Sequence, residues 1–223
     1  MCTVVIADKG SIPDWVVDHR TFRQWAHSDE FPEPGGFSFL DGKIWVDWTM
    51  EQLIAHNRVK SVVCHVIMGL VDVTQSGRYV ADRMLLSHLK ARLSSEPDGL
   101  YFHWKTVPAG RLKLVEGSEG DYTELEGTPD MVLEVISRSS VQKDTEILPE
   151  LYWRAGIPEY WLIDARSANP SFEILRHGSE GYEASPTSAH GQYSSAFEKW
   201  FRLVAATDPL GNPDYRLEYS DKE

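Results

Sequence analysis

The chain has 223 residues, enough for one domain or at most two small ones, and its 42% hydrophobic and 11% aromatic content can form a core. A charged fraction of 25% is ordinary and excludes wholesale disorder. The 22 Lys and Arg against 34 Asp and Glu give a net charge of −12. This balance argues against a protein that coats nucleic acid non-specifically, because such binding depends mainly on neutralising phosphates. It remains compatible with a nuclease that brings divalent cations to a narrow cleft.

Cysteine usage and apolar runs bear on the compartment. The two cysteines, Cys2 and Cys64, cannot supply a disulfide framework. The first apolar run, residues 3–7, is too short for the core of a signal peptide. No apolar stretch approaches the roughly 18 residues that a membrane span needs. We therefore expect a protein of the reducing cytoplasm, without a membrane partner.

The first quarter of the chain predicts a helix, a hairpin and a second helix. Aromatic residues fall at roughly helical spacing in residues 14–30, and the Pro- and Gly-rich residues 31–36 predict the end of that helix. Residues 37–48 alternate on both sides of Asp41-Gly42, which predicts a hairpin. Apolar residues recur near helical spacing over residues 51–71, and this is the clearest helix of the first half.

The next segment predicts short strands. Residues 79–93 fit either a strand or a helix. Residues 96–99 form a turn, and residues 100–104 are expected to leave it as a strand. Residues 112–115 are another short strand. Residues 116–128 are acidic and rich in Gly, which predicts a surface loop.

The last part of the chain alternates strands with one helix. Residues 131–136 are an apolar strand interrupted only by one glutamate, and Gly156 is expected to end a helix. Residues 160–163 predict a strand, and residues 172–176 and 182–184 predict a hairpin. Helices and strands are mixed throughout. The class is therefore α/β or α+β, as a single domain over residues 1–223 with an N-terminal helical extension over about 1–36.

Several familiar sites are absent from the sequence. It has no glycine-rich loop that ends in Gly-Lys-Ser/Thr, no Gly-x-Ser-x-Gly motif and no His-Glu-x-x-His pair. The eight histidines never combine with cysteine at a zinc-ligand spacing. The remaining candidates for chemistry are carboxylates.

Two Pro-Asp dipeptides, at 97–98 and 129–130, each lead into a predicted strand. Alternate residues of a strand share a face, so Asp130 and Glu134 point the same way. A carboxylate among Val and Leu is costly to bury unless it is paired or binds a metal, which singles out Glu134. The alternatives are an edge-strand glutamate that reaches water or an arginine, and, for Asp98, an ordinary aspartate before glycine in a turn.

Carboxylates on neighbouring strands suit a magnesium site. Mg²⁺ prefers oxygen ligands and usually takes one or two carboxylates while it keeps several waters. Held beside a phosphodiester, the ion activates a water and offsets charge on the leaving oxygens. A nearby lysine would position that water or stabilise the transition state.

A longer pattern follows the second dipeptide. It consists of Pro129-Asp130-Met131-Val132-Leu133-Glu134-Val135-Ile136-Ser137, Ser139-Ser140, Lys143-Asp144, Tyr152 and Gly156-Ile157-Pro158-Glu159-Tyr160-Trp161-Leu162-Ile163-Asp164. This segment resembles the Uma-two endonuclease family, within the PD-(D/E)XK restriction-endonuclease-like superfamily. The resemblance extends more weakly from residues 39–42 to residues 201–203.

The resemblance implies a mixed central sheet flanked by helices, and a Mg²⁺- or Mn²⁺-dependent endonuclease that hydrolyses phosphodiester bonds in DNA. Asp98 would be the motif aspartate and Glu134 the second acid, and the backbone carbonyl of Val135 could complete the metal shell. Asp130 would assist or, equally, cap a turn. Nucleic acid, DNA above all, is the implied partner, and a homodimer is left open.

The chain departs from the family pattern at its lysine. The superfamily's lysine lies two residues beyond the glutamate, where this chain has Ile136. The alternative position, four residues after Asp144, is Leu148, followed by Pro149, so the helix begins or kinks there. Lys143 is the nearest basic candidate for catalysis, and a solvated lysine beside Asp144 is the alternative.

Two rival functions stay open, a catalytically inactive nuclease-fold protein that binds nucleic acid or a protein partner, and a structural or regulatory partner protein. Glu51 and His56 are further candidates for the site. The alternative for each is a role in helix capping or in a surface contact. We predict that residues 100–104 and 131–136 lie in one sheet. We also predict that carboxylate oxygens of Asp98 and Glu134 lie within about 6 Å of each other, close enough to share an ion.

Overall fold

The computed structural model describes residues 5–6, 10–32, 36–47, 53–117, 120–167 and 169–221. Within these residues a central sheet has the strand order β14-β13-β12-β11-β8-β5. Its strands are β5 (Gly77–Ala81), β8 (Gly99–His103), β11 (Met131–Val135), β12 (Glu159–Asp164), β13 (Ser171–His177) and β14 (Tyr182–Ala184). The predictions for Cys2, Trp48 and Glu51 lie outside the described residues.

Strand β11 lies inside this sheet, with a partner on each side. It pairs antiparallel with β8, where Met131 lies opposite Tyr101 and Leu133 opposite Gly99. On its other side it pairs in parallel with β12. The prediction that residues 100–104 and 131–136 share one sheet is confirmed for the strands, and Trp104 itself begins the short helix η2 (Trp104–Thr106).

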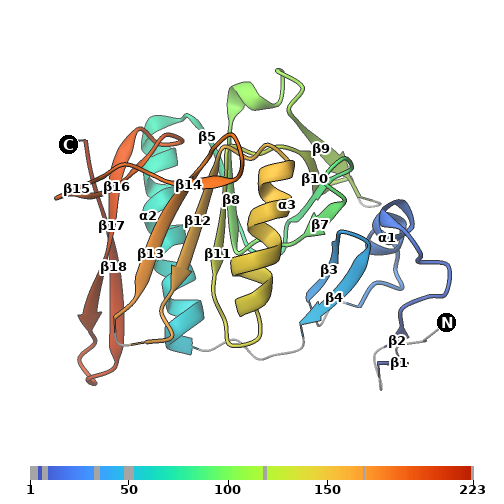
Figure 1. Cartoon of the computed structure of the whole chain (residues 1–223), viewed down its shortest axis with the longest axis horizontal. Coiled ribbons are helices and arrows are strands. Elements are labelled where there is room, and N and C mark those ends of the chain that lie inside the picture. Colours follow the sequence, from blue (N-terminus) through green and yellow to red (C-terminus); the bar gives the residue numbers. More distant parts are fainter. Residues whose placement is uncertain are drawn as a thin grey trace.

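Two helices cover the opposite faces of the sheet, α3 (Leu148–Arg154) in front and α2 (Val59–Thr74) behind in Figure 1. The alternation along β11 divides its side chains between two cores. Those at odd positions pack with α2, namely Met131, Leu133 and Val135. Val132 packs on the other side with Leu148 and Leu151 of α3. The expected restriction-endonuclease-like arrangement of a mixed sheet between helices is therefore present.

A second sheet has the strand order β4-β3-β7-β6-β10-β9 and lies beside the first (Figure 1). Its strands are β3 (Gly36–Leu40), β4 (Lys43–Asp47), β6 (Leu85–His88), β7 (Leu93–Ser95), β9 (Leu112–Glu116) and β10 (Tyr122–Gly127). The predicted hairpin is β3–β4. Its turn residues Asp41 and Gly42 both have positive φ, of 45° and 86°, as the tight turn of a two-residue hairpin requires.

Helix α1 (His19–Ala26) covers this second sheet, as the aromatic spacing of residues 14–30 predicts. Asp18 caps it by accepting a hydrogen bond from the backbone N–H of Thr21 at 2.7 Å. Phe22 and Trp25 point from the helix onto the sheet, where they pack with Phe37 and Phe39 of β3.

A third sheet stands next to α2, in the order β15-β16-β17-β18. Its strands are β15 (Thr187–Ser188), β16 (Gly191–Ser194), β17 (Lys199–Thr207) and β18 (Pro213–Ser220), and the remaining elements are β1 (Val5–Ile6), β2 (Gly10–Ser11), η1 (Leu53–Arg58) and η3 (Lys143–Ile147). Glu159 ties this sheet to the central one, because its buried carboxylate accepts hydrogen bonds from Ser194 and from the backbone of Ser195.

The prediction of a surface loop over residues 116–128 is wrong. Residues 122–127 form strand β10, which pairs with β9 and β6. The acidic character that suggested a loop has a structural cause, since Glu124 is fully buried and its charge is met by Arg23 of α1 at 2.6 Å. The ambiguous residues 79–93 supply strand, in β5 and β6. Among the described residues no helix is both long and apolar enough to cross a membrane.

Candidate active site

Asp98 stands at the start of β8, beside the end of β11. The backbone N–H of Val135 donates a hydrogen bond to Asp98 Oδ2 at 2.7 Å. Val132 lies opposite Leu100 in the register, and both pack in the core on the α3 side. The pairing runs to Leu133 and Gly99, so Glu134 and Asp98 are the next residues along the two chains. Glu134 lies on the α3 side, against Tyr152, and the Asp98 side chain faces the beginning of α2. The separation of about 6 Å stays a prediction.

Two basic side chains from the beginning of the α2 helix reach Asp98. His56 Nε2, from the π-helical turn η1, lies 3.5 Å from Asp98 Oδ2, and Lys60 Nζ lies 3.3 Å from Oδ1. Burial by itself raises the pKa of Asp98, but the hydrogen bond and charge of His56 and then the charge of Lys60 outweigh it, so the pKa is lowered. Asp98 is therefore held as a carboxylate. The sequence singled out His56 but missed Lys60, whose signal was its position four residues along the same helix.

Glu134 is only 2% exposed, in the middle of a hydrophobic layer. The Tyr152 hydroxyl of α3 donates a hydrogen bond to Glu134 Oε1 at 2.6 Å and fixes the carboxyl group. Burial raises the pKa of Glu134 well above its ordinary value, against the opposing charge of Lys143, and the charges of Asp144 and Asp98 raise it further. Such a group is short of positive charge.

Lys143 extends from η3 toward these acids, and its side chain is only 20% exposed. Its Nζ lies 3.6 Å from Asp144 Oδ1. Burial by itself lowers the pKa of Lys143, but the charges of Glu134, Asp144 and Asp98 overcome it and raise the pKa above the ordinary value. The ammonium group therefore stays protonated among carboxylates, and the solvated-lysine alternative does not describe its surroundings.

The two positions where the family pattern expects a lysine are part of the core. Ile136 is 4% exposed and Leu148 is fully buried. Pro149 stands at the beginning of α3, as predicted, and leaves Lys143 on the preceding π-helical segment. Lys143 is thus a lysine whose charge acts on Glu134.

Asp144 is a member of the group that the sequence reasoning did not select. It is 1% exposed, and Ser140 donates a hydrogen bond to its Oδ2. Its Oδ1 is buried without a hydrogen-bond partner among the described residues. Burial raises the pKa of Asp144 to about 6, against the charge of Lys143. The available signal was its place next to Lys143 in the motif, four residues after Ser140.

Asp130 lies at the other end of β11, away from the group. Its Oδ2 accepts a hydrogen bond from the backbone N–H of His103 at 2.8 Å, and Thr106 and Arg111 also donate to its carboxylate. These contacts hold the turn that follows β8. The structure does not bring Asp130 together with Asp98 and Glu134, and its surroundings are those of the turn-capping alternative.

The mixed sheet between two helices, with acids where β8 and β11 adjoin, defines a nuclease-like fold. A family model, Uma2, described as "Putative restriction endonuclease", matches residues 20–205. The match covers most of the 223 residues, so the chain belongs to this family. No curated protein matches.

A solved structure of similar fold is described as a "putative nuclease belonging to DUF820 from Anabaena variabilis ATCC 29413". It shares 20% sequence identity, with a TM-score of 0.57. The similarity covers 77% of this chain and 87% of that chain. At this identity the likeness supports the fold.

Proposed function

We propose that this protein is a metal-dependent nuclease that hydrolyses phosphodiester bonds in DNA at the group formed by Asp98, Glu134, Lys143 and Asp144. The observation that carries the proposal is the hydrogen bond from the Val135 N–H, next to Glu134, to Asp98, together with the action of both acids on the charge of Lys143. Membership of the Uma2 family supports a nuclease, and the geometry supplies its candidate residues.

The donor set suits a hard divalent cation. Asp98, Glu134 and Asp144 offer carboxylate oxygens, the ligand type that Mg²⁺ and Mn²⁺ take. Asp144 Oδ1 is buried, with Lys143 Nζ at 3.6 Å and no hydrogen bond from the described residues. Burial raises the pKa of Glu134 against the charge of Lys143. Asp98 and Glu134, with the backbone carbonyl of Val135, would hold the ion.

Mg²⁺ and Mn²⁺ are the ions that we propose for this set. Among the described residues no three His, Cys, Asp or Glu side chains converge as a ready-made metal cluster. Such a closed cluster is typical of structural zinc, whereas Mg²⁺ is usually held by one or two carboxylates and keeps several waters. When bound, the ion would activate a water and offset the charge on the leaving oxygen.

The other residues orient the acids and set the charge of the site. Lys143 keeps a protonated ammonium on a long stem and would contact a non-bridging oxygen of the phosphate as negative charge develops there. Tyr152 fixes the orientation of Glu134, and the Val135 N–H fixes that of Asp98. His56 and Lys60 keep Asp98 ionised.

The test is cleavage of single-stranded, duplex and supercoiled DNA by the full chain with Mg²⁺ or Mn²⁺, with a chelator as the blank. We expect Glu134→Gln to lose activity by about a hundredfold or more, as is typical when one catalytic contact is removed. Glu173→Gln, an exposed acid on β13, is the matched control and should cut normally. A wild-type protein that cuts none of these substrates with either ion would overturn the catalytic proposal.

The second candidate is a catalytically inactive nuclease-fold protein that binds nucleic acid. The burial of Ile136 and Leu148 at the two expected lysine positions favours it. It predicts tight, metal-dependent DNA binding without cleavage, and normal binding by Lys143→Ala.

A further inference from the structure

A small pocket opens next to the carboxylate group, between the end of α1 and the turns that precede β6 and β8. It has a volume of about 280 Å³. The residues that matter for its chemistry are His27, Ser28, Phe31, Arg83 and Glu96. We call it the side pocket. Its volume lies just below the range of small-molecule sites, about 300–1,000 Å³, so it suits a group no larger than a single base.

The side pocket adjoins the candidate active site through two of its wall residues. Glu96 precedes Asp98 by two residues, and its carboxyl group interacts with the charge of Lys143. Arg83 follows Asp82, whose backbone N–H donates to the Asp98 carbonyl at 3.3 Å. The Asp82 carboxylate also lies 3.2 Å from Lys60 Nζ. A molecule in the pocket would therefore lie beside whatever occupies the carboxylate group.

The turn that carries Arg83 is held in an unfavourable backbone conformation. Asp82 and Arg83 are consecutive non-glycine residues with positive φ, 52° and 55°. Residues other than glycine are uncommon in this region, and those that occur there concentrate at functional sites. Arg83 is exposed, and its charge acts on the carboxyl group of Glu96 across the pocket wall. Its planar guanidinium matches the paired oxygens of a phosphate.

The remaining walls suit a nucleobase. Phe31 is partly buried against Trp25, with ring centroids 4.8 Å apart, and also lines the pocket. Aromatic rings stack on bases without regard to sequence. Glu96 is half-buried, and its carboxylate can accept a hydrogen bond from the amino group at a base edge.

We propose that the side pocket binds the base of one unpaired nucleotide next to the scissile phosphate, with Arg83 on the adjoining phosphate and Glu96 on the base edge. The inference rests on the proposed function and names its substrate class, DNA with an unpaired nucleotide at the cleavage site. A paired base would have to leave the stack before it could enter, at a cost that an unpaired base does not have.

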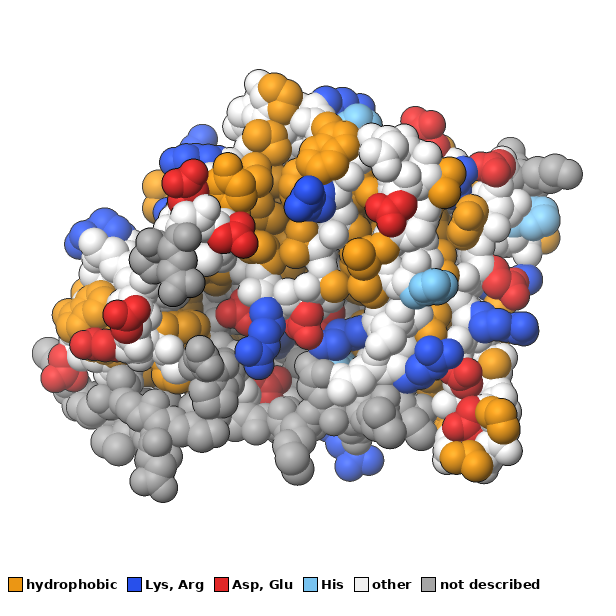
Figure 2. Space-filling model, turned by 180° about the vertical axis from the view of Figure 1, so that it is seen from behind, with side chains coloured by type: hydrophobic (Ala, Val, Ile, Leu, Met, Phe, Trp, Pro, Cys, Tyr) orange, Lys and Arg blue, Asp and Glu red, His pale blue; other side chains and the backbone are white. Residues whose placement is uncertain are grey.

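The charge distribution on the surface favours recognition of nucleic acid through a few local contacts. On the face that Figure 2 shows, acidic and basic side chains are interspersed rather than gathered into one basic stripe. A broad basic surface would favour duplex DNA of any sequence through its phosphates. With a net charge of −12, this protein needs local contacts, and Arg83 offers one beside the pocket.

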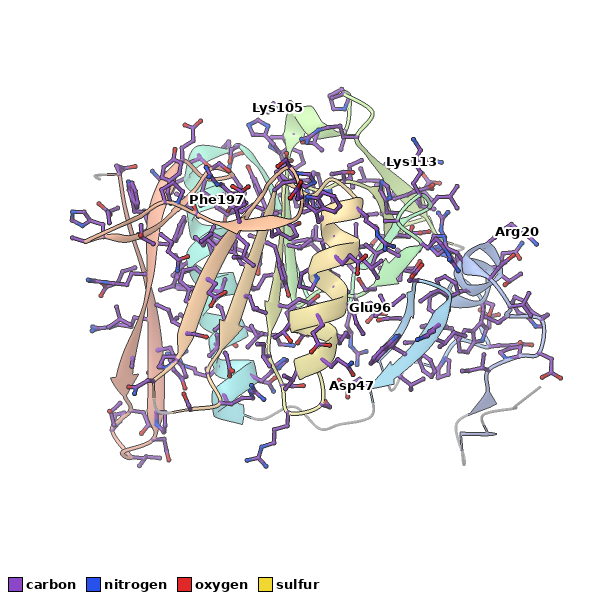
Figure 3. The ribbon with its side chains drawn as sticks, viewed as in Figure 1. Arg20, Asp47, Glu96, Lys105, Lys113 and Phe197 are labelled. Atoms are coloured by element: carbon purple, nitrogen blue, oxygen red, sulfur yellow. The ribbon has the colours of Figure 1, made fainter. Side chains whose placement is uncertain are left out.

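An oligonucleotide-binding assay tests this inference independently of catalysis. The probes are fluorescent oligonucleotides that are single-stranded, fully duplex, or duplex with one unpaired nucleotide, bound by the Glu134→Gln protein with Ca²⁺ and followed by anisotropy. We expect the two probes with unpaired nucleotides to bind more tightly than the duplex. Adding Arg83→Ala or Glu96→Ala should reduce that preference about tenfold, the usual effect of losing a charged hydrogen bond. Arg20→Ala, an exposed arginine on the far side of α1 in Figure 3, is the matched control.

An abasic site in the single-stranded probe identifies the nucleotide whose base enters the side pocket. Moved one position at a time along the single strand, it should weaken binding about tenfold at one position and little elsewhere. Equal affinity for paired and unpaired probes, or an unchanged preference in Arg83→Ala, would overturn the inference while leaving nuclease activity intact. If the preference and its loss in Arg83→Ala are observed but the wild type cuts no DNA, the pocket is confirmed and the catalytic proposal fails.

Discussion

The Val135 backbone N–H donates to Asp98 Oδ2 at 2.7 Å, so β11 holds the acid that precedes β8. The contact ties a candidate catalytic side chain to the paired strands rather than to a mobile loop. It also separates two properties of Asp98 that substitutions can test independently, its acceptor oxygen and its charge.

Asp98→Asn keeps an acceptor oxygen for Val135 but loses the charge that faces His56 and Lys60. We expect nuclease activity to fall about a hundredfold or more. The melting temperature should fall modestly, because the lowered pKa means that the charged form of Asp98 stabilises the fold at neutral pH. Asp98→Ala also leaves a backbone N–H unpaired, which costs about 1–3 kcal/mol and lowers the melting temperature by several degrees. An Asn variant that cuts at the wild-type rate would remove Asp98 from the mechanism.

Glu134→Gln separates activity from stability. The amide can still accept the Tyr152 hydrogen bond, but it carries no charge to bury. The raised pKa of Glu134 means that the folded protein keeps its proton at a pH where the unfolded chain has lost it. Wild-type stability therefore falls as the pH rises above the unfolded value of about 4.3.

Measured by thermal melting in a chelator, Glu134→Gln should be at least as stable as the wild type, and its advantage should grow as the pH rises above the unfolded value of about 4.3. Its nuclease activity should be lost. A variant that is less stable than the wild type at pH 8 would show that the Glu134 charge is already compensated within the fold.

The sequence predicted those parts of the fold whose pattern is contained in one segment. Strands β8, β11 and β12 and the helix α2 each show their own periodicity or apolar run, and so were predictable without knowledge of their neighbours. Strand β10 was missed because its acids are matched by Arg23, about 100 residues away in the sequence, and nothing local shows that pairing.

The same distinction holds for the candidate site. Asp98 and Glu134 stand out locally, as an acid in a Pro-Asp turn and an acid in an apolar strand. Lys60 and Asp144 join them only through the packing of α2 and η3 against the strand ends, which a linear pattern does not specify. Lys143 was selected as the nearest base in the sequence. The structure adds that its side chain is largely buried and lies beside acidic groups.

Lys143→Ala tests the basic member of the group. Because its charge opposes the rise in the pKa values of Glu134 and Asp144, its loss should raise both further. We expect activity to fall about a hundredfold or more. Lys105→Ala, on the short helix η2 at the opposite end of β8 (Figure 3), is the control and should cut normally. Normal cutting by Lys143→Ala would leave the lysine without a catalytic role.

The fourth prediction concerns Glu124, which is distant from the proposed chemistry. Its buried carboxylate accepts hydrogen bonds from Arg23 Nε at 2.6 Å and from Ser87, and it pairs with His27 at 2.7 Å. Burial raises its pKa, but the hydrogen bonds from Arg23, Ser87 and His27 outweigh burial and leave the pKa lowered. This contact fastens α1 to β10.

A lowered carboxyl pKa contributes stability that is present above the unfolded value and is lost as the pH falls through the folded value. At pH 7, Glu124→Gln should therefore be less stable than the wild type by about 2 kcal/mol, the range for hydrogen bonds to a charged group. The difference should shrink below about pH 4.3, where the unfolded chain also binds the proton. Chemical denaturation at pH 7 and pH 4 measures it, with Glu173→Gln as the exposed control. A difference that is equal at both pH values would show that Glu124 stabilises α1 through shape and not through charge.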